Sequence, residues 1–350
     1  MKALVISGKN AAPDWREVAD LTAGPGEAIV RVHAAALNHR DVWIQRGQYA
    51  GLKYPIVLGS DGAGVVTAVG EPSGGSGAGG DDQGWIGKAV IIDPALYWGG
   101  KAAYQDPSGF RILGLPDDGT MAEYVKVPIS NLFEKPAHLS FEEAAALPLA
   151  GVTAYRALFT RARVGAGERV LITGIGGGVA LFALQYAVAA GLQVFVSSGS
   201  DEKLERAKAM GAMGGANYKN PGWVDELRKP GGGFDVILDG AGGDGFSDLL
   251  DLCVPGGRVV LYGATRGNPS NIVLRRIFWK QLNVLGSTMG SPEDFAAMVG
   301  FVSKHEIRPV VDSIFPPEDG GTAFQLMEEG GQFGKIVLSL QQPAIYASWP

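Results

Sequence analysis

The chain has 350 residues, of which 46% are hydrophobic and 53 are glycine, and its formal net charge is -6 at pH 7. This length is enough for two domains with separate cores, and a glycine share about twice the usual one is typical of folds with many tight βα turns. The acidic balance without any basic run argues against a nucleic-acid partner, and the longest apolar stretch, residues 179–192, is too short to cross a bilayer. Residues 1–7 read as a strand rather than a signal peptide, so we expect a cytoplasmic protein with neither a nucleic-acid nor a membrane partner.

The first part of the chain, residues 1–128, is rich in short alternating strands such as 28–33 and 64–69. This pattern predicts an antiparallel, partly barrel-like β domain. A capping box at Ser140–Glu143 then begins a helix that Pro148 should kink or end. We interpret this helix as the crossing into a second domain.

The most informative stretch is 169–180, where an apolar strand (170–173) runs directly into a glycine cluster and an apolar helix (179–190) leaves it. Small residues there let the backbone approach a pyrophosphate, and free N–H groups at the start of the helix point at the anion. The spacing Gly174-x-x-Gly177-x-x-Ala180 is a variant of the dinucleotide-binding fingerprint, with a plain βα turn as the alternative. The residues expected to contact the cofactor here are Gly174, Gly176, Gly177, Gly178 and Val179.

The next strand (193–197) ends at Ser198, about where an NAD-binding unit carries an acidic residue for the ribose 2′-hydroxyl. Here that place holds Ser198, Ser200 and Lys203, which suit a 2′-phosphate that would repel a carboxylate. Ser200 is also the expected N-cap of the following helix, and a solvated helix lysine is the alternative for Lys203. The pattern therefore favours NADPH over NADH.

Strand and helix patterns alternate from about 130 to 285, with strands at 169–173, 193–198, 234–239, 257–262 and 282–286. This alternation predicts a doubly wound parallel sheet, which binds ligands at the carboxyl ends of its strands. A helix (292–304) and a strand (335–339) follow, in a segment that we expect to return to the first domain. The turns after the last three strands of the sheet should line the ribose and nicotinamide through Ala241, Gly263, Ala264, Thr265, Ser287, Thr288 and Met289.

Several motifs in order along the chain resemble one family. They are Leu-Asn-His-Arg-Asp-Val-Trp (37–43) with Gly47, Leu-Gly-Ser-Asp-Gly-Ala-Gly (58–64), Leu-Pro-Leu-Ala-Gly-Val-Thr-Ala-Tyr-Arg (147–156), the glycine turn and Gly-Lys-Ile-Val-Leu (334–338). Over nearly its whole length the chain is similar to the medium-chain dehydrogenase/reductase superfamily, and within it to the zinc-free quinone oxidoreductase branch. The resemblance implies an α/β architecture. It comprises a GroES-like catalytic domain (1–128), a Rossmann domain (129–288) and a return segment (289–350) that completes the catalytic domain, with the active site in the cleft.

The zinc branch of that superfamily takes its catalytic metal ligands from a cysteine, a Gly-His-Glu motif and a later cysteine or acidic residue. The matching positions here are Asn38, Ser60 with Asp61, and the region 149–152. The stretch 94–114, which matches the structural-zinc lobe, has no cysteine, because the only cysteine is Cys253, predicted as a buried thiol in an apolar helical stretch. We expect no metal, with a zinc site built from His39, Asp41 and Asp61 as the alternative.

Without a metal, hydrogen-bond donors must stabilise the enolate that forms when hydride reaches a quinone or enone. Asn38 and Tyr49 are the donors that we expect nearest. The resemblance places Asn38, Trp43 and Thr153 near the nicotinamide, although Trp43 could equally be a core residue and Tyr49 a plain loop residue. We expect Asp41 to hold the local turn rather than act as a base. The resemblance also implies that Tyr218 packs at the 2′-phosphate, and that Lys335 reaches the cofactor unless it is a surface lysine.

The leading hypothesis is an NADPH-dependent, metal-free reductase that transfers hydride to a quinone or an α,β-unsaturated carbonyl. The alternatives are a zinc-dependent alcohol dehydrogenase with an atypical metal site and a nicotinamide-binding protein with little catalysis. The sequence does not name the substrate, because the walls of such a site come from loops. The superfamily usually pairs through the edge of the Rossmann sheet. The segment 273–279 and the strand 282–286 should therefore form a homodimer interface, unless Ile277 and Phe278 pack only on their own domain.

Overall fold

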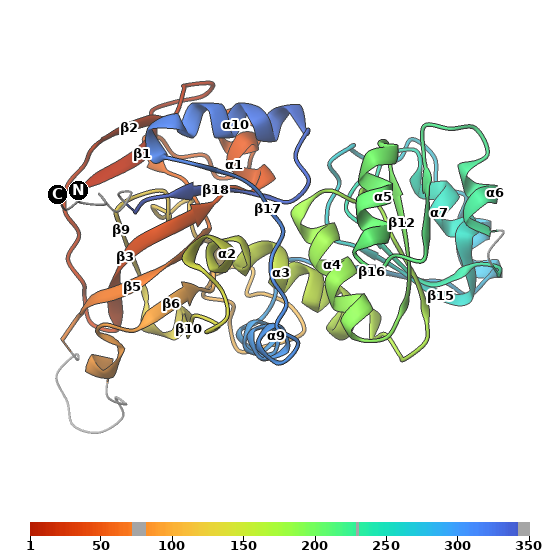
Figure 1. Ribbon diagram of the computed structural model, residues 1–350, viewed down its shortest axis with the longest axis horizontal. Helices are drawn as coiled ribbons and strands as arrows, with labels where there is room; N and C mark the ends of the chain where they lie inside the picture. The colour runs from red at the N-terminus through yellow and green to blue at the C-terminus, as the bar shows by residue number, and fades with distance from the viewer. Residues whose placement is uncertain (72–81, 229–230, 342–350) are drawn as a thin grey trace, which may run out of the picture. The chain divides into compact units, whose positions relative to one another are not determined.

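The computed structural model describes residues 1–71, 82–228 and 231–341 (Figure 1). The chain divides into two compact units, the first formed by Met1–Leu149 with Arg308–Pro350 and the second by Ala150–Ile307. The boundaries predicted at 128 and 288 are therefore both too early. The first is too early because α2 (Phe141–Ala146) packs on strands of the first unit. The second is too early because α9 (Pro292–Lys304) packs in the second unit, where Phe301 contacts Tyr155 and Tyr186.

The first unit is a β domain in which the end of the chain completes a sheet begun near its start. Its largest sheet has the order β10-β6-β5-β3-β18-β17, with β9 also pairing with β3, and smaller sheets have the orders β2-β1-β4 and β7-β8. The prediction that the C-terminal segment returns to this domain is confirmed, since β18 pairs antiparallel with β3. Its strands are β1 (Lys2–Ile6), β2 (Asp14–Glu17), β3 (Glu27–Ala36), β4 (Ile56–Val57), β5 (Asp61–Val69), β6 (Ala89–Ile92), β7 (Ala95–Leu96), β8 (Arg111–Ile112), β9 (Tyr124–Pro128), β10 (Leu132–Glu134), β17 (Val311–Phe315) and β18 (Lys335–Ser339).

Besides its strands, this β domain contains helices and short 3₁₀ turns. The predicted capping box of α2 is confirmed, since Glu143 N donates to Ser140 Oγ (3.1 Å) and Ser140 N donates to Glu143 Oε2 (2.9 Å). The remaining helical segments are α1 (His39–Gln45), α10 (Gly320–Glu329), η1 (Asp82–Trp85), η2 (Ile129–Asn131) and η4 (Pro317–Asp319).

The second unit is the predicted doubly wound sheet, with all strands parallel in the order β13-β12-β11-β14-β15-β16. Its strands are β11 (Arg169–Ile172), β12 (Gln193–Ser198), β13 (Gly214–Asn217), β14 (Phe234–Asp239), β15 (Cys253–Leu261) and β16 (Asn283–Gly286). Its other helical segments are α3 (Pro148–Tyr155), the π-helix η3 (Arg156–Ala162), α4 (Gly178–Ala189), α5 (Asp201–Ala209), α6 (Trp223–Arg228), α7 (Phe246–Leu252) and α8 (Leu274–Trp279).

One local prediction is wrong in this unit. Cys253 was expected within a helical stretch, but α7 ends at Leu252 and Cys253 is the first residue of β15, paired with Phe234. Pro255 explains the difference, because proline disfavours helical backbone in the residue before it. The thiol is buried as expected, and burial raises its pKa to about 12.

The cysteine-free lobe at 94–114 is held together by aromatic packing and local hydrogen bonds. The rings of Trp98 and Phe110 meet edge to face at 5.4 Å, and Trp98 Nε1 donates to the carbonyl of Lys101 (3.0 Å). Asp106 N donates to the carbonyl of Trp98 (2.7 Å), and the Asp106 carboxylate accepts from Ser108 N (2.9 Å). These contacts, all between residues of the lobe itself, hold its backbone in place without cysteine ligands.

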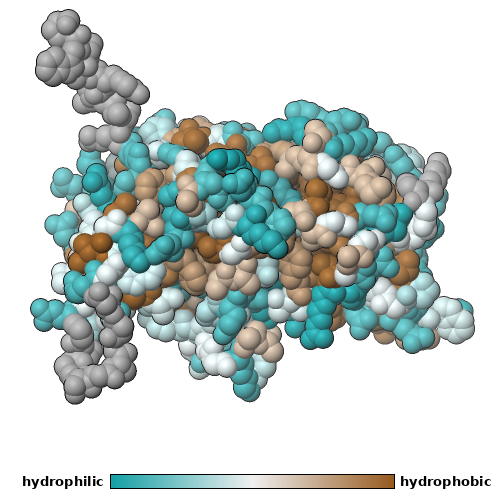
Figure 2. Space-filling model, turned by 60° about the horizontal axis from the view of Figure 1, so that its bottom comes forward, coloured by the Kyte–Doolittle hydropathy of each residue, from teal (hydrophilic) through white to brown (hydrophobic). Residues whose placement is uncertain are grey.

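No helix within the described ranges is long and apolar enough to cross a membrane. On the face drawn in Figure 2, brown, hydrophobic residues lie interspersed with teal, hydrophilic ones.

Asp93, directly after β6, is a buried acid whose titration should set the pH dependence of stability. Burial raises its pKa to about 8 from an ordinary value of 3.8, against the opposing hydrogen bond from Ala95 N. The folded protein therefore keeps a proton that the unfolded chain releases above pH 4, so the stability from this group falls as pH rises toward 8.

We expect Asp93→Asn, which keeps a neutral acceptor for Ala95 N, to remove this dependence. Across that window the wild type should lose about 1.4 kcal/mol per pH unit relative to the variant. Urea denaturation of both proteins at pH 5, 6.5 and 8 measures the difference. Parallel profiles would mean that Asp93 is already ionised at pH 5 in the folded protein.

Candidate functional site

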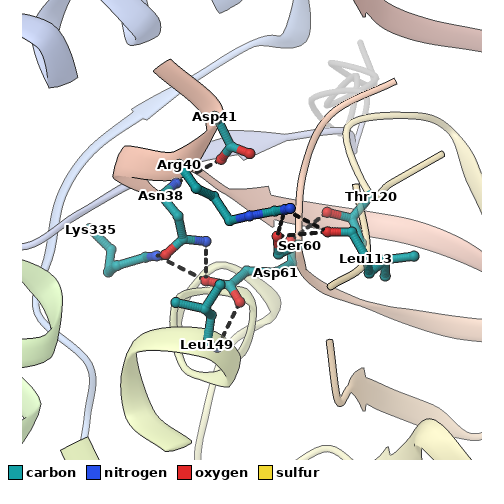
Figure 3. Close-up of polar contacts among 9 residues, drawn as sticks. All are labelled: Asn38, Arg40, Asp41, Ser60, Asp61, Leu113, Thr120, Leu149 and Lys335. Carbon is teal, nitrogen blue, oxygen red and sulfur yellow. Dashed lines mark hydrogen bonds and ion pairs between the residues drawn. The ribbon is translucent and has the colours of Figure 1, made fainter. Parts of the chain in front are cut away.

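Three buried polar side chains of the first unit converge in a closed set of hydrogen bonds (Figure 3). The Lys335 ammonium contacts Asn38 Oδ1 at 2.7 Å and Asp61 Oδ2 at 2.8 Å, and Asn38 Nδ2 donates to the same Asp61 oxygen at 2.9 Å. The Lys335 and Asp61 side chains are only 4% and 0% exposed. We call Asn38, Asp61 and Lys335 the Lys335 cluster.

The sheet register brings these distant residues together. β3 lies between β5 and β18, and its last residue, Ala36, pairs with Asp61 on one side and with Val337 on the other. Asn38 follows two residues later, at the start of α1, so its side chain reaches both neighbours. The backbone N–H of Leu149, released from helical bonding at the start of α3, donates to Asp61 Oδ1 (2.7 Å).

Asp41 fixes the start of α1, as expected. Its Oδ2 accepts from the backbone N–H of Asn38 (2.8 Å). Burial raises the pKa of Asp41 to about 6, while the nearby Arg40 guanidinium acts in the opposite direction. Asp41 therefore acts on the Lys335 cluster through the backbone that carries Asn38.

A second set of contacts fixes Arg40 and Ser60, residues close in the chain to Asn38 and Asp61. Arg40 donates from one guanidinium nitrogen to Ser60 Oγ (2.6 Å) and to the carbonyl of Leu113 (2.9 Å), and Ser60 Oγ donates to the same carbonyl (2.7 Å). The guanidinium carbon lies 5.1 Å from the centre of the Tyr49 ring, which also packs on the core. This contact places Tyr49 beside Arg40.

His39 and Trp43 lie together on α1, with ring centres 5.8 Å apart, edge to face. His39 is exposed and Trp43 half-buried, so Trp43 is not a fully buried core residue. Partial removal from water and the Lys335 ammonium lower the pKa of His39. In the parts of the chain that the structure describes, no three His, Cys, Asp or Glu side chains are placed to hold a metal.

The glycine turn of the second unit has the geometry that a pyrophosphate needs. Gly176 has φ +120°, a backbone conformation that favours glycine, and a Cβ there would lie 2.8 Å from Lys203 Cδ. The N-cap of α4 is Gly177, which has no capping side chain, so the N–H groups of the first turn are left for a ligand. The turn therefore fits an anion, with Lys203 lying across it.

The polar residues predicted for the 2′-phosphate gather at the end of β12. Ser200 caps α5, its backbone N–H donates to Ser198 Oγ (3.2 Å), and Tyr218 N donates to the carbonyl of Ser198 (3.0 Å). The Arg266 guanidinium lies 5.3 Å from the centre of the Tyr218 ring and adds a positive charge that the sequence reasoning missed. The sequence does contain a clue to this charge, because Arg266 directly follows Thr265, which is one of the predicted cofactor contacts.

The other predicted cofactor residues follow the carboxyl ends of β14, β15 and β16. Asp239 Oδ1 accepts from Thr173 Oγ1 (2.6 Å) and from Ala241 N (3.1 Å), which ties the ends of β11 and β14 together. Gly263, Ala264, Thr265 and Thr288 are exposed, Ser287 is half-buried, and Met289 is buried. Thr153 is buried on α3. Their contacts with a cofactor stay a prediction, and the arrangement fits one.

Lys335 is buried, so the surface-lysine alternative is wrong, and its ammonium is bound to Asn38 and Asp61; its contact with a cofactor stays a prediction. The sequence indicates Asp61 only as a possible metal ligand, because no local pattern joins it to a residue as distant as Lys335. A lone acid in the apolar run 56–69 was the available signal.

Comparisons with known proteins agree with both units. Residues 24–137 match a family model described as alcohol dehydrogenase GroES-like domain, and residues 178–304 match one described as zinc-binding dehydrogenase. The zinc-type alcohol dehydrogenase-like protein YogA of Leptosphaeria maculans is 36% identical over 335 residues, covering 91% of each chain. The acryloyl-coenzyme A reductase of Metallosphaera sedula is 30% identical over 344 residues, covering 97% of this chain and 100% of its own. A crystal structure of an NAD-dependent alcohol dehydrogenase superposes with a TM-score of 0.89 at 37% identity, covering 97% of this chain and 100% of that one.

Proposed function

The chain belongs to the medium-chain dehydrogenase/reductase superfamily, and from this premise we propose that it is an NADPH-dependent, metal-free reductase of α,β-unsaturated carbonyls or quinones. The observation that carries the proposal is the Lys335 cluster. In this cluster the buried ammonium of Lys335 is held by Asn38 and Asp61. By the resemblance, these two residues match the positions of metal ligands in the zinc branch. A nicotinamide dinucleotide, when bound, supplies or accepts a hydride.

The cluster suits the charge that develops in such a reduction. Hydride adds to the β-carbon of an enone, the electrons move to the carbonyl oxygen, and the resulting enolate takes a proton at the α-carbon from water. The ammonium of Lys335 has three N–H donors. Within the described residues it donates to two acceptors, Asn38 Oδ1 and Asp61 Oδ2. The third can donate to the enolate oxygen, and preorganised charge of this kind stabilises a transition state.

The residues at the end of β12 favour NADPH within this proposal. Hydroxyls and cations from Ser198, Ser200, Lys203 and Arg266 suit a 2′-phosphate, while the first carboxylate after β12, Asp201, accepts from Asn217 Nδ2 (2.8 Å) and begins α5. The similar crystal structure described as NAD-dependent makes this choice a point that needs direct measurement.

A zinc- and NAD-dependent alcohol dehydrogenase is the second candidate, favoured by the descriptions of YogA and of that crystal structure. A dinucleotide-binding protein with little turnover is the third. Against the second stands the chemistry of Asp61, whose two oxygens already accept from Leu149, Asn38 and Lys335. The description of the Metallosphaera sedula relative as an acryloyl-coenzyme A reductase supports reduction of an activated double bond.

The test is steady-state NADPH oxidation against a panel of enones, quinones and aldehydes, with NADH, alcohol oxidation and metal analysis on the same sample. We expect turnover of an enone or quinone with NADPH, no stoichiometric zinc, and activity that EDTA leaves intact. A tightly bound zinc that alcohol oxidation requires would establish the second candidate. Binding of NADPH without turnover on the whole panel would favour the third.

We also propose that two copies pair through the exposed edge of the second unit's sheet. Among the described residues the edge strand β16 pairs only with β15, and α8, which precedes it in the chain, exposes Leu274 (67%), Phe278 (66%) and Trp279 (73%). Ile277 packs on its own core, so the intramolecular alternative holds for that residue but leaves Phe278 exposed. Large apolar side chains next to an unpaired edge are typical of interfaces.

We expect the wild type to sediment as a dimer at micromolar concentration and Trp279→Glu as a monomer. The matched control is Met213→Glu, since Met213 is similarly exposed (64%) but lies next to β13, at the other edge of the same sheet. This control should remain dimeric. A monomeric wild type would contradict the proposed pairing.

A further inference from the structure

The turn between β16 and α9, residues 287–290, is held in an unusual backbone conformation. Met289 has φ +46° although it is not glycine, and its side chain is buried. A Cβ at Gly290 would overlap the side chain of Val152, so the turn packs directly on α3. Such conformations persist only where the surroundings impose them, because an L-residue in this region costs about 1 kcal/mol or more.

Both ends of this turn are fastened to the same segment, the π-helix η3. At the start of the turn, Arg161 Nε donates to the carbonyl of Gly286 (2.9 Å). At its end, Arg156 forms an ion pair with Asp294, and the Thr160 hydroxyl donates to the other oxygen of the same carboxylate. Asp294 also accepts from Ser291 N (3.0 Å) at the cap of α9.

The energetics of this ion pair point to a role beyond stability. The side chains of Arg156 and Asp294 are only 3% and 8% exposed, and a buried pair gives little net stabilisation because both charges lose water. π-Helical segments are rare and recur at functional sites. The turn itself follows a strand at the carboxyl edge of a parallel sheet, where dinucleotides bind.

One donor of the turn is left uncommitted. The hydroxyl of Ser287 is buried and has no hydrogen-bond partner in the described part of the chain. Buried polar atoms normally have a partner, so such an atom calls for an explanation. A ligand group that reaches the turn would supply one.

We propose that Arg156, Thr160 and Asp294 are positioning residues, which hold the turn 287–290 in the conformation that receives the nicotinamide end of the cofactor. The inference rests on the proposed dinucleotide binding and extends it to three residues that act through the turn. The alternative is that the ion pair only attaches α9 to its unit.

The test compares NADPH with adenosine 2′,5′-bisphosphate, a ligand that has the adenosine and 2′-phosphate but no nicotinamide. Asp294→Asn removes the charge from the ion pair but keeps an acceptor for Ser291 N. We expect its dissociation constant for NADPH to rise about tenfold or more, because the turn that receives the nicotinamide is no longer held in place. We also expect a lower kcat, because small displacements at a reacting group slow the reaction. Binding of the bisphosphate should change less than about twofold, because the adenosine end is untouched.

Two further variants keep the result interpretable. Thr160→Val removes one hydrogen bond but leaves the ion pair, so it should fold. It should shift the ratio of the dissociation constants for NADPH and the bisphosphate in the same direction. If Asp294→Asn does not fold, the Thr160→Val ratio decides. Asp251→Asn disrupts the half-buried Arg276–Asp251 pair, which joins α7 and α8 of the same unit, and it should lower the melting temperature without changing the ratio.

An unchanged ratio in Asp294→Asn and Thr160→Val would overturn the inference and leave the ion pair a structural one. This failure is distinguishable from failure of the proposed function. In the latter case the wild type itself would not bind or oxidise NADPH.

Discussion

Replacing Lys335 with methionine should lower kcat for enone reduction by about 10²- to 10³-fold, the cost of removing one preorganised donor to a developing oxyanion. Methionine keeps the length and apolar stem of lysine but not its charge. NADPH binding should change little, because all the other residues proposed to hold the dinucleotide lie in the second unit. Single-turnover measurements with saturating NADPH separate the chemical step from binding.

The stability of this variant needs its own control. Removing Lys335 leaves Asp61 buried and without its ion-pair partner, and breaking a buried pair in this way costs about 3–5 kcal/mol. The double variant Lys335→Met/Asp61→Asn removes both charges, so it should recover most of the stability while remaining inactive. Lys88→Met breaks an exposed ion pair with Glu134 in the same unit and should leave activity intact. Full activity in the stable double variant would exclude Lys335 from the chemistry.

The second unit could be predicted well because its signals are local. The strand, glycine turn and helix at 169–190 form one contiguous pattern, and the structure has β11 and α4 within one residue of the predicted bounds. The capping residues Ser140 and Ser200 and the helix at 292–304 were correct for the same reason, since a cap and its first turn lie within four residues.

What the sequence could not provide depends on contacts between distant segments. Lys335 and Asp61 meet only because β18 and β5 flank β3, and no local period encodes that order. Arg266 reaches Tyr218 from the end of another strand. The domain boundaries were placed too early for the same reason: α2 and α9 have helical patterns, but what each one packs on is a tertiary property.

Replacing Lys203 with alanine should weaken NADPH binding by roughly 1–2 kcal/mol, the size of a charged hydrogen bond at a partly exposed site, and leave NADH nearly unchanged. The reason is that Lys203 lies across the glycine turn, beside the serines that replace the acidic residue of an NAD site. Titration of both cofactors by fluorescence measures the two affinities.

The double variant Lys203→Ala/Arg266→Ala should lose still more NADPH affinity, because it removes both cations proposed for the 2′-phosphate. Lys208 is the matched control, since it lies on the same helix, α5, and its ammonium pairs with Glu205 at the surface. Lys208→Ala should therefore leave both cofactors unaffected. If Lys203→Ala weakened NADPH and NADH equally, the lysine would contact the shared pyrophosphate instead, and the preference for NADPH would have to rest on Arg266 and the serines alone.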